Sequence, residues 1–152
     1  IFLDEVFLSS TMLSFKNQHD YFLLKRKIMR VYPYVDSVNQ MLTVLDSSLN
    51  NFKKKRHTRR YIRKYQNKIM EQFSSSISNL TRQEGVILSK LIYREFNITV
   101  YDLINKYRGR THAFFWQGLS RLYDGNLKST YYPEHNIKDR DIEYILQNDI
   151  KK

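Results

Sequence analysis

The sequence predicts an all-α fold: a long kinked helix, an antiparallel helical hairpin and a C-terminal cluster of shorter helices, with a short N-terminal β-strand as the one addition. Three observations favour this fold. They are an unbroken 3-4-3-4 spacing of apolar residues over 21–49, a second helical stripe over 62–73 and helix-capping sequences in the C-terminal half. The 152 residues fit a single domain, 1–152, because domains usually contain about 100–200 residues.

The N-terminal segment 1–15 differs from the rest of the chain, and we expect it to form an extended arm or strand. Residues 2–8 are mostly apolar and are followed by two serines, which is typical of a strand. A lone strand needs a partner strand. The candidate partners are 11–15 and the segment 127–132, which contains Thr and Tyr.

A long helix is predicted over 21–49, where apolar residues recur in steps of three and four. This spacing places them on one seam, as in a coiled coil. Proline inside a helix removes a backbone hydrogen bond and clashes with the preceding turn, so Pro33 should kink the helix. The seam stays in phase across Pro33, which favours one kinked helix over two separate ones. The seam consists of Tyr21, Leu24, Ile28, Val31, Val35, Val38, Leu42, Leu45 and Leu49.

A second helix is predicted over 58–77, because apolar residues recur with helical spacing from Ile62 to Phe73. The connector 53–57 is short. The second helix should therefore return antiparallel to the long helix and form a helical hairpin with it.

The opposite face of this second helix is strongly basic. Nine of the 26 Lys and Arg residues lie between 53 and 68 with no acidic residue among them, and outside this segment 17 basic residues stand against 15 acidic ones. The net charge of +11 is therefore mainly a local feature, which we interpret as a face for an anionic partner, the alternative being a solvated surface. This candidate anionic-partner face consists of Arg56, Arg60, Arg63, Lys64 and Lys68.

The C-terminal half contains two sequences typical of helix starts. Thr81 and Glu84 form a capping box before a helix predicted over 86–96. Thr99 begins a similar sequence before a helix predicted over 100–107.

Two further helices are predicted towards the C-terminus. Gly109 is placed to end the preceding helix, and a highly apolar helix follows over 112–123. Asp139 is expected to cap a last helix that carries Ile142 and Ile150 on its apolar side.

Composition and motifs exclude several classes of protein. Without cysteine there is no thiol catalysis, disulfide or cysteine-ligated metal. No apolar run approaches about 18 residues, so we expect no transmembrane segment. No P-loop, dinucleotide-binding fingerprint or serine-hydrolase motif occurs, and we therefore predict no cofactor and name no catalytic residue. The four histidines lack the i, i+4 spacing of two metal ligands on one helix, so no metal site is predicted.

A second candidate surface lies in the C-terminal half, where aromatic and basic residues concentrate. Trp and Arg are typical anchors at binding surfaces. The alternative is that the aromatic residues belong to the core, since large aromatics dominate cores. Arginines need ion partners if they are buried. This candidate binding surface consists of Arg94, Arg108, Arg110, His112, Trp116, Gln117, Lys128 and Tyr132.

Three stretches carry a resemblance to a known family: 30–34 (RVYPY), 91–95 (LIYRE) and 114–123 (FFWQGLSRLY), the last leading into 126–128 (NLK). In their order and composition they resemble a Bacteroidetes-type secreted family catalogued as domain of unknown function 4294. The resemblance implies a helical fold and export to the periplasm or cell envelope, and it carries no activity and no catalytic residue. Because Ile1 is not an initiator methionine, we also expect a mature or excised chain.

The leading functional hypothesis is a non-enzymatic envelope or periplasmic domain that binds a protein partner or an anionic ligand. The alternative is a hydrolase-type enzyme acting on envelope material, which should show a concave site with converging polar groups. Glu84 and Glu95, about 16 Å apart by helix rise, are too distant for a glycosidase pair. Nucleic-acid binding through the basic helix face ranks third, because no known DNA-binding motif accompanies it.

Overall fold

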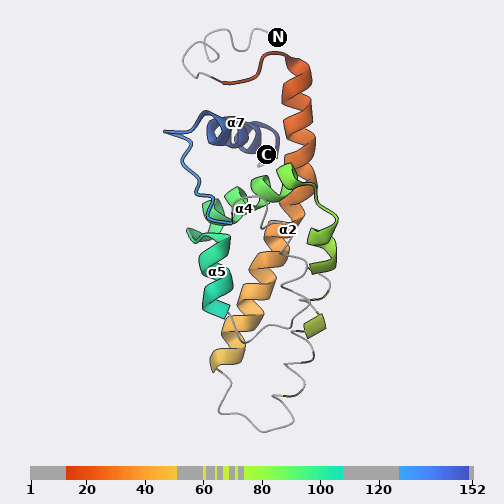
Figure 1. Ribbon diagram of the computed structural model, residues 1–152, viewed down its shortest axis with the longest axis vertical. Helices are drawn as coiled ribbons and strands as arrows, with labels where there is room; N and C mark the ends of the chain where they lie inside the picture. Colours follow the sequence, from red (N-terminus) through yellow and green to blue (C-terminus); the bar gives the residue numbers. More distant parts are fainter. Residues whose placement is uncertain are drawn as a thin grey trace.

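The structure of the protein, a computed structural model, describes residues 13–50, 60, 64, 67–68, 71, 74–107 and 127–150. In this part of the chain the regular elements are α2 (Gln18–Asn50), α4 (Arg82–Phe96), α5 (Val100–Tyr107), α7 (Ile137–Ile145) and the π-helix η1 (Leu146–Ile150). The predicted all-α class is confirmed for the described residues, which contain no strand. α2 runs along the length of the molecule, and α4 and α7 lie across it (Figure 1). α5 lies beside the C-terminal part of α2.

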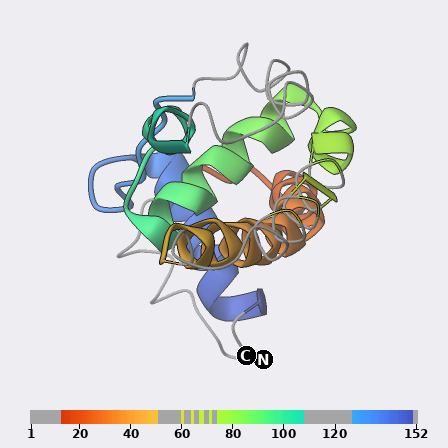
Figure 2. The same ribbon diagram turned by 90° about the horizontal axis from the view of Figure 1, so that it is seen from below.

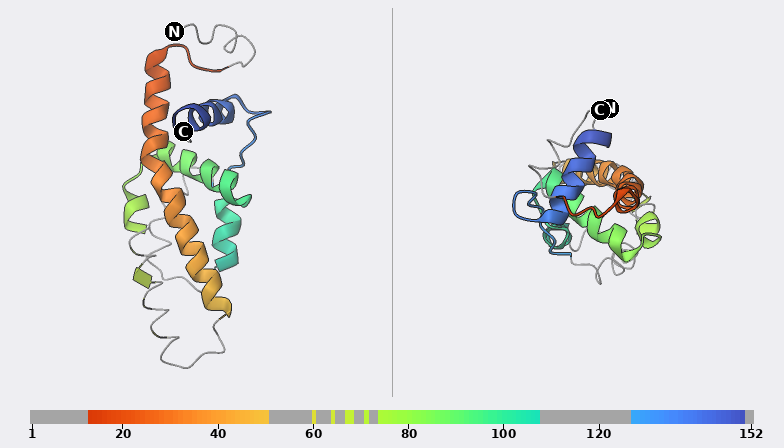
Figure 3. Two further views of the ribbon diagram at one scale, coloured as in Figure 1. Left: turned by 180° about the vertical axis from the view of Figure 1, so that it is seen from behind. Right: turned by 90° about the horizontal axis from the view of Figure 1, so that it is seen from above.

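The predicted long helix is confirmed as a single element. α2 contains Pro33 in its interior, and Asn17 caps its start by accepting the Asp20 N–H at 2.9 Å. Figures 1 and 3 show that α2 bends along its length, as expected where proline removes a backbone hydrogen bond. The middle of the predicted seam faces the core. Four of the described seam residues are buried: Ile28, Val31, Val35 and Val38.

The second helix of the predicted hairpin, 58–77, lies largely outside the described residues. Its described residues from Arg60 to Ser78 are helical. Ile77 is buried in the same core as the seam of α2. The antiparallel packing of this helix on α2 falls on residues outside the described part and stays a prediction.

Three other predictions also fall outside the described residues: the strand over 2–8, the helix end at Gly109 and the apolar helix over 112–123. The segment 127–132, one of the two candidate partners of the strand, is described and has an irregular backbone. It therefore supplies no strand for the N-terminal segment.

Both predicted caps at the start of α4 and α5 are confirmed. The Thr81 hydroxyl oxygen accepts the Glu84 N–H at 3.3 Å, and the Glu84 carboxylate accepts the Thr81 N–H at 2.8 Å, which completes the capping box. Thr99 accepts the Asp102 N–H at 3.1 Å at the start of α5. α4 ends at Phe96 and is capped by Asn97, whose φ of 52° places it in the left-handed conformation common at helix ends.

The predicted cap of the last helix is wrong. Asn136 caps α7, and its side-chain oxygen accepts the N–H groups of Lys138 and Asp139 at 2.9 and 3.3 Å. Asn is as good an N-cap as Asp. Asp139 lies within the helix and is only 1% exposed. Its carboxylate instead forms an ion pair with Lys90 in the interior.

The core lies where α2, α4 and α7 meet. Side chains from all three helices are completely buried there, together with the first residue of η1, and all are 0% exposed: Ile28, Val31, Leu88, Ile145 and Leu146. Seen from below, α4 and α7 cross one another beside α2 (Figure 2). η1 is joined to α2 through Asp149, which binds the Tyr21 hydroxyl and lies 3.3 Å from the Lys25 amine.

Candidate functional site

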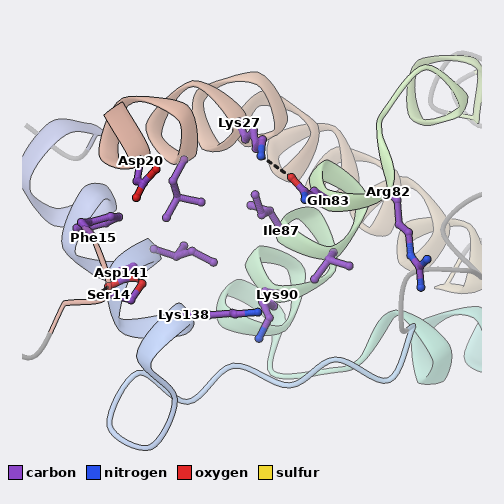
Figure 4. A pocket seen from close by; sticks show the side chains of 13 residues that line it. Ser14, Phe15, Asp20, Lys27, Arg82, Gln83, Ile87, Lys90, Lys138 and Asp141 are labelled. Atoms are coloured by element: carbon purple, nitrogen blue, oxygen red, sulfur yellow. Dashed lines mark hydrogen bonds between the residues drawn. The ribbon is translucent and has the colours of Figure 1, made fainter. Parts of the chain in front are cut away.

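A cavity of about 680 Å³ lies between α2, α4 and α7, next to Ser14 and Phe15. Drug-sized ligands usually occupy cavities of about 300–1,000 Å³. Each helix lines the cavity with residues that share one face, as Asp20, Leu24 and Lys27 do on α2. Figure 4 shows side chains from the three helices around this space.

Part of the cavity lining is apolar. The apolar lining residues come from all three helices and the N-terminal segment, and they are Phe15, Leu24, Val86, Ile87 and Ile142. Ile87 and Ile142 belong to the buried core, while Phe15 and Leu24 pack against it. A lining of this kind favours a ligand with an apolar part, because burial removes that part from water.

Four basic side chains line the same cavity: Lys27, Arg82, Lys90 and Lys138. Lys90 forms an ion pair with Asp139. Lys27 donates a hydrogen bond to the neutral side chain of Gln83. The other two make no ion pair with any described carboxylate. In Figure 4 Lys90 and Lys138 lie on the α4 and α7 side of the cavity and Lys27 on the α2 side.

Two carboxylates, Asp20 and Asp141, also line the cavity. Asp141 is 2% exposed, and its two oxygens accept hydrogen bonds from the Ser14 N–H, at 3.0 Å, and from the Ser14 hydroxyl. These two donors offset part of the cost of burying the charge. Asp20 is partly buried and belongs to the first turn of α2. Three basic lining groups, Lys27, Arg82 and Lys138, make no ion pair within the described part of the chain, and they outnumber the two carboxylates of the lining. The lining therefore favours a negatively charged ligand.

Among the described lining residues, Ser14 carries the hydroxyl group. The Ser14 hydroxyl donates to a carboxylate, and the described lining contains no histidine that could act as its general base. Within the described ranges no three His, Cys, Asp or Glu side chains are grouped so as to hold a metal ion.

Two ion pairs join α4 to α7 beside the cavity. Lys90 pairs with Asp139, and Arg94 pairs with Glu143 four residues further along both helices. Arg94 binds in bidentate fashion, donating from Nε and Nη2 to the two Glu143 oxygens at 2.7 and 2.8 Å. The Tyr131 hydroxyl donates to the same carboxylate at 2.7 Å. These contacts set the position of α7 relative to α4.

The hydrogen bonds from Arg94 hold the pKa of Glu143 well below its usual range, at about 2, against the opposing effect of burial. Tyr131 and Gln147 add further hydrogen bonds that lower it. The same interaction with Glu143 raises the pKa of Arg94 above its already high value. Burial, together with the hydrogen bond to Glu143, raises the pKa of Tyr131. Glu143 is therefore a carboxylate at neutral pH and acts as the centre of a structural network.

The predicted candidate binding surface is described at three of its residues, and none of the three lines the cavity. Arg94 pairs with Glu143. The Lys128 amine lies 4.7 Å from the ring centre of Tyr101, and the Tyr132 hydroxyl is 2.8 Å from the Tyr93 hydroxyl. The other members lie outside the described residues: Arg108, Arg110, His112, Trp116 and Gln117.

The candidate anionic-partner face is also described in part. Arg60, Lys64 and Lys68 are helical and exposed. Arg56 and Arg63 lie outside the described residues. Exposure is expected both of a binding face and of a solvated surface, so the role of this face stays a prediction.

Sequence reasoning missed the cavity residues and the partners of α7. It assigned Asp139 to the cap of the last helix and gave Asp141 no role in a site, whereas both are buried. The signal that could have located the site is the position of these acids beside Ile142 and Ile145 on the apolar side of the helix. A carboxylate at such a position needs a partner from another element.

In the described part of the chain no helix is both long and apolar enough to span a membrane. No curated protein and no solved structure matches the chain. A family model described as a domain of unknown function (DUF4294) matches residues 1–148. Because this match covers nearly all of the 152 residues, the chain belongs to the DUF4294 family.

Proposed function

We propose that the protein is a non-enzymatic binding domain of the cell envelope or periplasm and that its ligand is anionic. The observation that carries the proposal is the cavity between α2, α4 and α7. There an apolar lining meets three basic side chains that make no ion pair with any described carboxylate: Lys27, Arg82 and Lys138. Apolar burial supplies affinity for such a ligand, and the charged groups supply orientation and selectivity.

The probe for this proposal is 8-anilinonaphthalene-1-sulfonate, which joins an aromatic body to one sulfonate and becomes fluorescent in apolar sites. We expect saturable binding to the native protein. Val86→Phe places a larger side chain in the cavity lining and should weaken binding about tenfold or more, equivalent to about 1.4 kcal/mol. The double variant Lys27→Gln/Lys138→Gln should also weaken binding and reduce its dependence on salt, because two attractive charges are lost.

The matched control is Arg60→Gln/Lys64→Gln, which removes two charges from the exposed basic helix face. Its probe affinity should equal that of the native protein. Binding that survives Val86→Phe but disappears in this control would assign the ligand to the helix face and contradict the cavity proposal. Circular dichroism and thermal unfolding of each variant establish that the fold is retained.

The location of the protein is part of the same proposal and is supported by the resemblance to a secreted family. Fractionation of cells that produce the full-length protein should place it in the periplasmic or envelope fraction. Recovery with the cytosolic proteins would contradict the proposed location while leaving the binding proposal intact.

A further inference from the structure

A second cavity, of about 450 Å³, adjoins the first at the start of α4. Lys27, Arg82 and Gln83 line both cavities. The hydrogen bond from Lys27 to Gln83, drawn as a dashed line in Figure 4, therefore forms part of the boundary between them. The remaining lining residues of the second cavity are Arg26, Arg30, Thr81 and Glu84.

The charged groups of the second cavity are mostly basic: Arg26, Lys27, Arg30 and Arg82 against the single carboxylate of Glu84. Glu84 is buried and already engaged, because Arg30 lies 3.2 Å from it and the Thr81 N–H donates to it at 2.8 Å. Three basic groups thus border the cavity without an ion partner in the described part of the chain.

The basic groups of the second cavity come from two helices. Arg26 and Lys27 are neighbours on α2, and Arg82 lines the cavity from α4. Because Arg30 is paired with Glu84, the other three basic groups are left to attract an anion. Guanidinium groups bind phosphate oxygens through paired hydrogen bonds, so two free arginines favour a phosphate over a simple halide ion.

We infer that the two cavities form one site for an amphiphile with a phosphate head group. The head group binds among Arg26, Lys27 and Arg82 in the second cavity, and the apolar tail lies against the lining of the first. Lys27 borders both cavities and exchanges its hydrogen bond to Gln83 for one to the head group. This inference rests on the proposed function and specifies the class of its ligand.

Titration calorimetry with octyl phosphate tests the inference, with octyl glucoside as the neutral-headed probe and inorganic phosphate as the head group alone. Octyl phosphate should bind most tightly of the three.

Arg26 lines only the second of the two cavities, so its substitutions test the head-group site. Arg26→Gln should weaken the binding of octyl phosphate about tenfold, because one charge-assisted contact is lost, and Arg26→Glu should weaken this binding more. Neither variant should change binding of octyl glucoside or of the naphthalene sulfonate. Arg60→Gln, on the exposed helix face, is the matched control and should leave all affinities unchanged.

The outcomes separate this inference from the proposed function. If Arg26→Glu binds octyl phosphate as tightly as the native protein does, or if octyl glucoside binds as tightly as octyl phosphate, the head-group site is wrong while the first cavity stands. If Val86→Phe leaves octyl phosphate binding intact while Arg26→Glu abolishes it, the second cavity is a simple anion site and the shared amphiphile site is wrong. If neither octyl phosphate nor the naphthalene sulfonate binds the native protein, both proposals fail.

Discussion

α4 contacts α2 and α7 in different ways. With α2 it forms the largest contact among the described helices, and the buried residues of both are mainly aliphatic. With α7 it is joined by long charged side chains, in the pairs Lys90–Asp139 and Arg94–Glu143. The comparison shows what each kind of contact supplies. Aliphatic packing provides most of the stability, whereas the ion pairs orient α7 beside a cavity whose lining is partly apolar and partly charged.

The difference between the aliphatic and the charged contact also affects where a ligand can bind. Close-packed aliphatic side chains leave little space between helices. Charged side chains need room for hydrogen bonds, and the cavity lies on the side of α4 that carries Lys90. Four predictions test these contacts, in order of decreasing effect.

The largest effect is expected in the aliphatic contact. Leu88→Ala should lower the free energy of unfolding by about 2–5 kcal/mol, because the side chain is fully buried and its loss leaves a cavity. Leu42→Ala is the comparison variant. Leu42 packs against the core but is only partly buried, so its loss should cost less. Urea denaturation measures both, and a larger effect for Leu42→Ala would mean that the centre of the core is misplaced.

The next effect concerns the charged contact. Arg94→Met and Glu143→Gln should each cost about 1–3 kcal/mol, because each leaves one partly buried charge without its partner. The double variant should cost less than the sum, with a coupling energy of about 0.5–3 kcal/mol. Denaturation of all four proteins completes the cycle. Strictly additive losses would show that the pair contributes no mutual stabilisation.

The same pair predicts a pH dependence with a defined sign. The pKa of Glu143 is about 2 in the folded protein, below its value of about 4.3 in an unfolded chain. The stabilisation is therefore complete above pH 4.3 and is lost as the pH falls towards 2. Allowing for solvent screening, the loss amounts to about 1–3 kcal/mol.

Glu143→Gln provides the reference for this measurement because Gln does not titrate. The difference in unfolding free energy between native protein and Glu143→Gln should shrink as the pH falls from about 4.5 to 2. A difference that stays constant across this range would contradict the role given to the Glu143 charge.

The smallest effect concerns a local contact that is independent of both helix pairs. Thr81→Ala should cost about 1 kcal/mol, because it removes the side-chain acceptor of the α4 capping box. Thr43→Ala is the matched control, since Thr43 is exposed and its hydroxyl only donates to the Asn39 carbonyl, at 2.9 Å, within α2. Its effect should stay below about 0.5 kcal/mol. Equal thermal shifts in the two variants would show that the cap adds nothing.

The features that sequence reasoning predicted correctly depend on neighbours along the chain. The capping box needs only Thr81 and Glu84, three residues apart. The length of α2 across Pro33 followed from a periodic apolar seam. Such patterns act within one turn or along one helix face, so they can be read without knowing what packs against them.

Spacing and local hydrogen bonding were enough to specify α2 with its buried face, and α4 and α5 with their threonine caps. Which charges pair with one another depends on the tertiary fold. Arg94 and Glu143 are 49 residues apart, and Ser14 and Asp141 are 127 apart. The cavities are also a tertiary outcome, since Lys27, Arg82 and Lys138 reach them from three helices. A charged side chain can pair with many partners of opposite sign, and only the crossing of α2, α4 and α7 brings one of them within hydrogen-bonding distance.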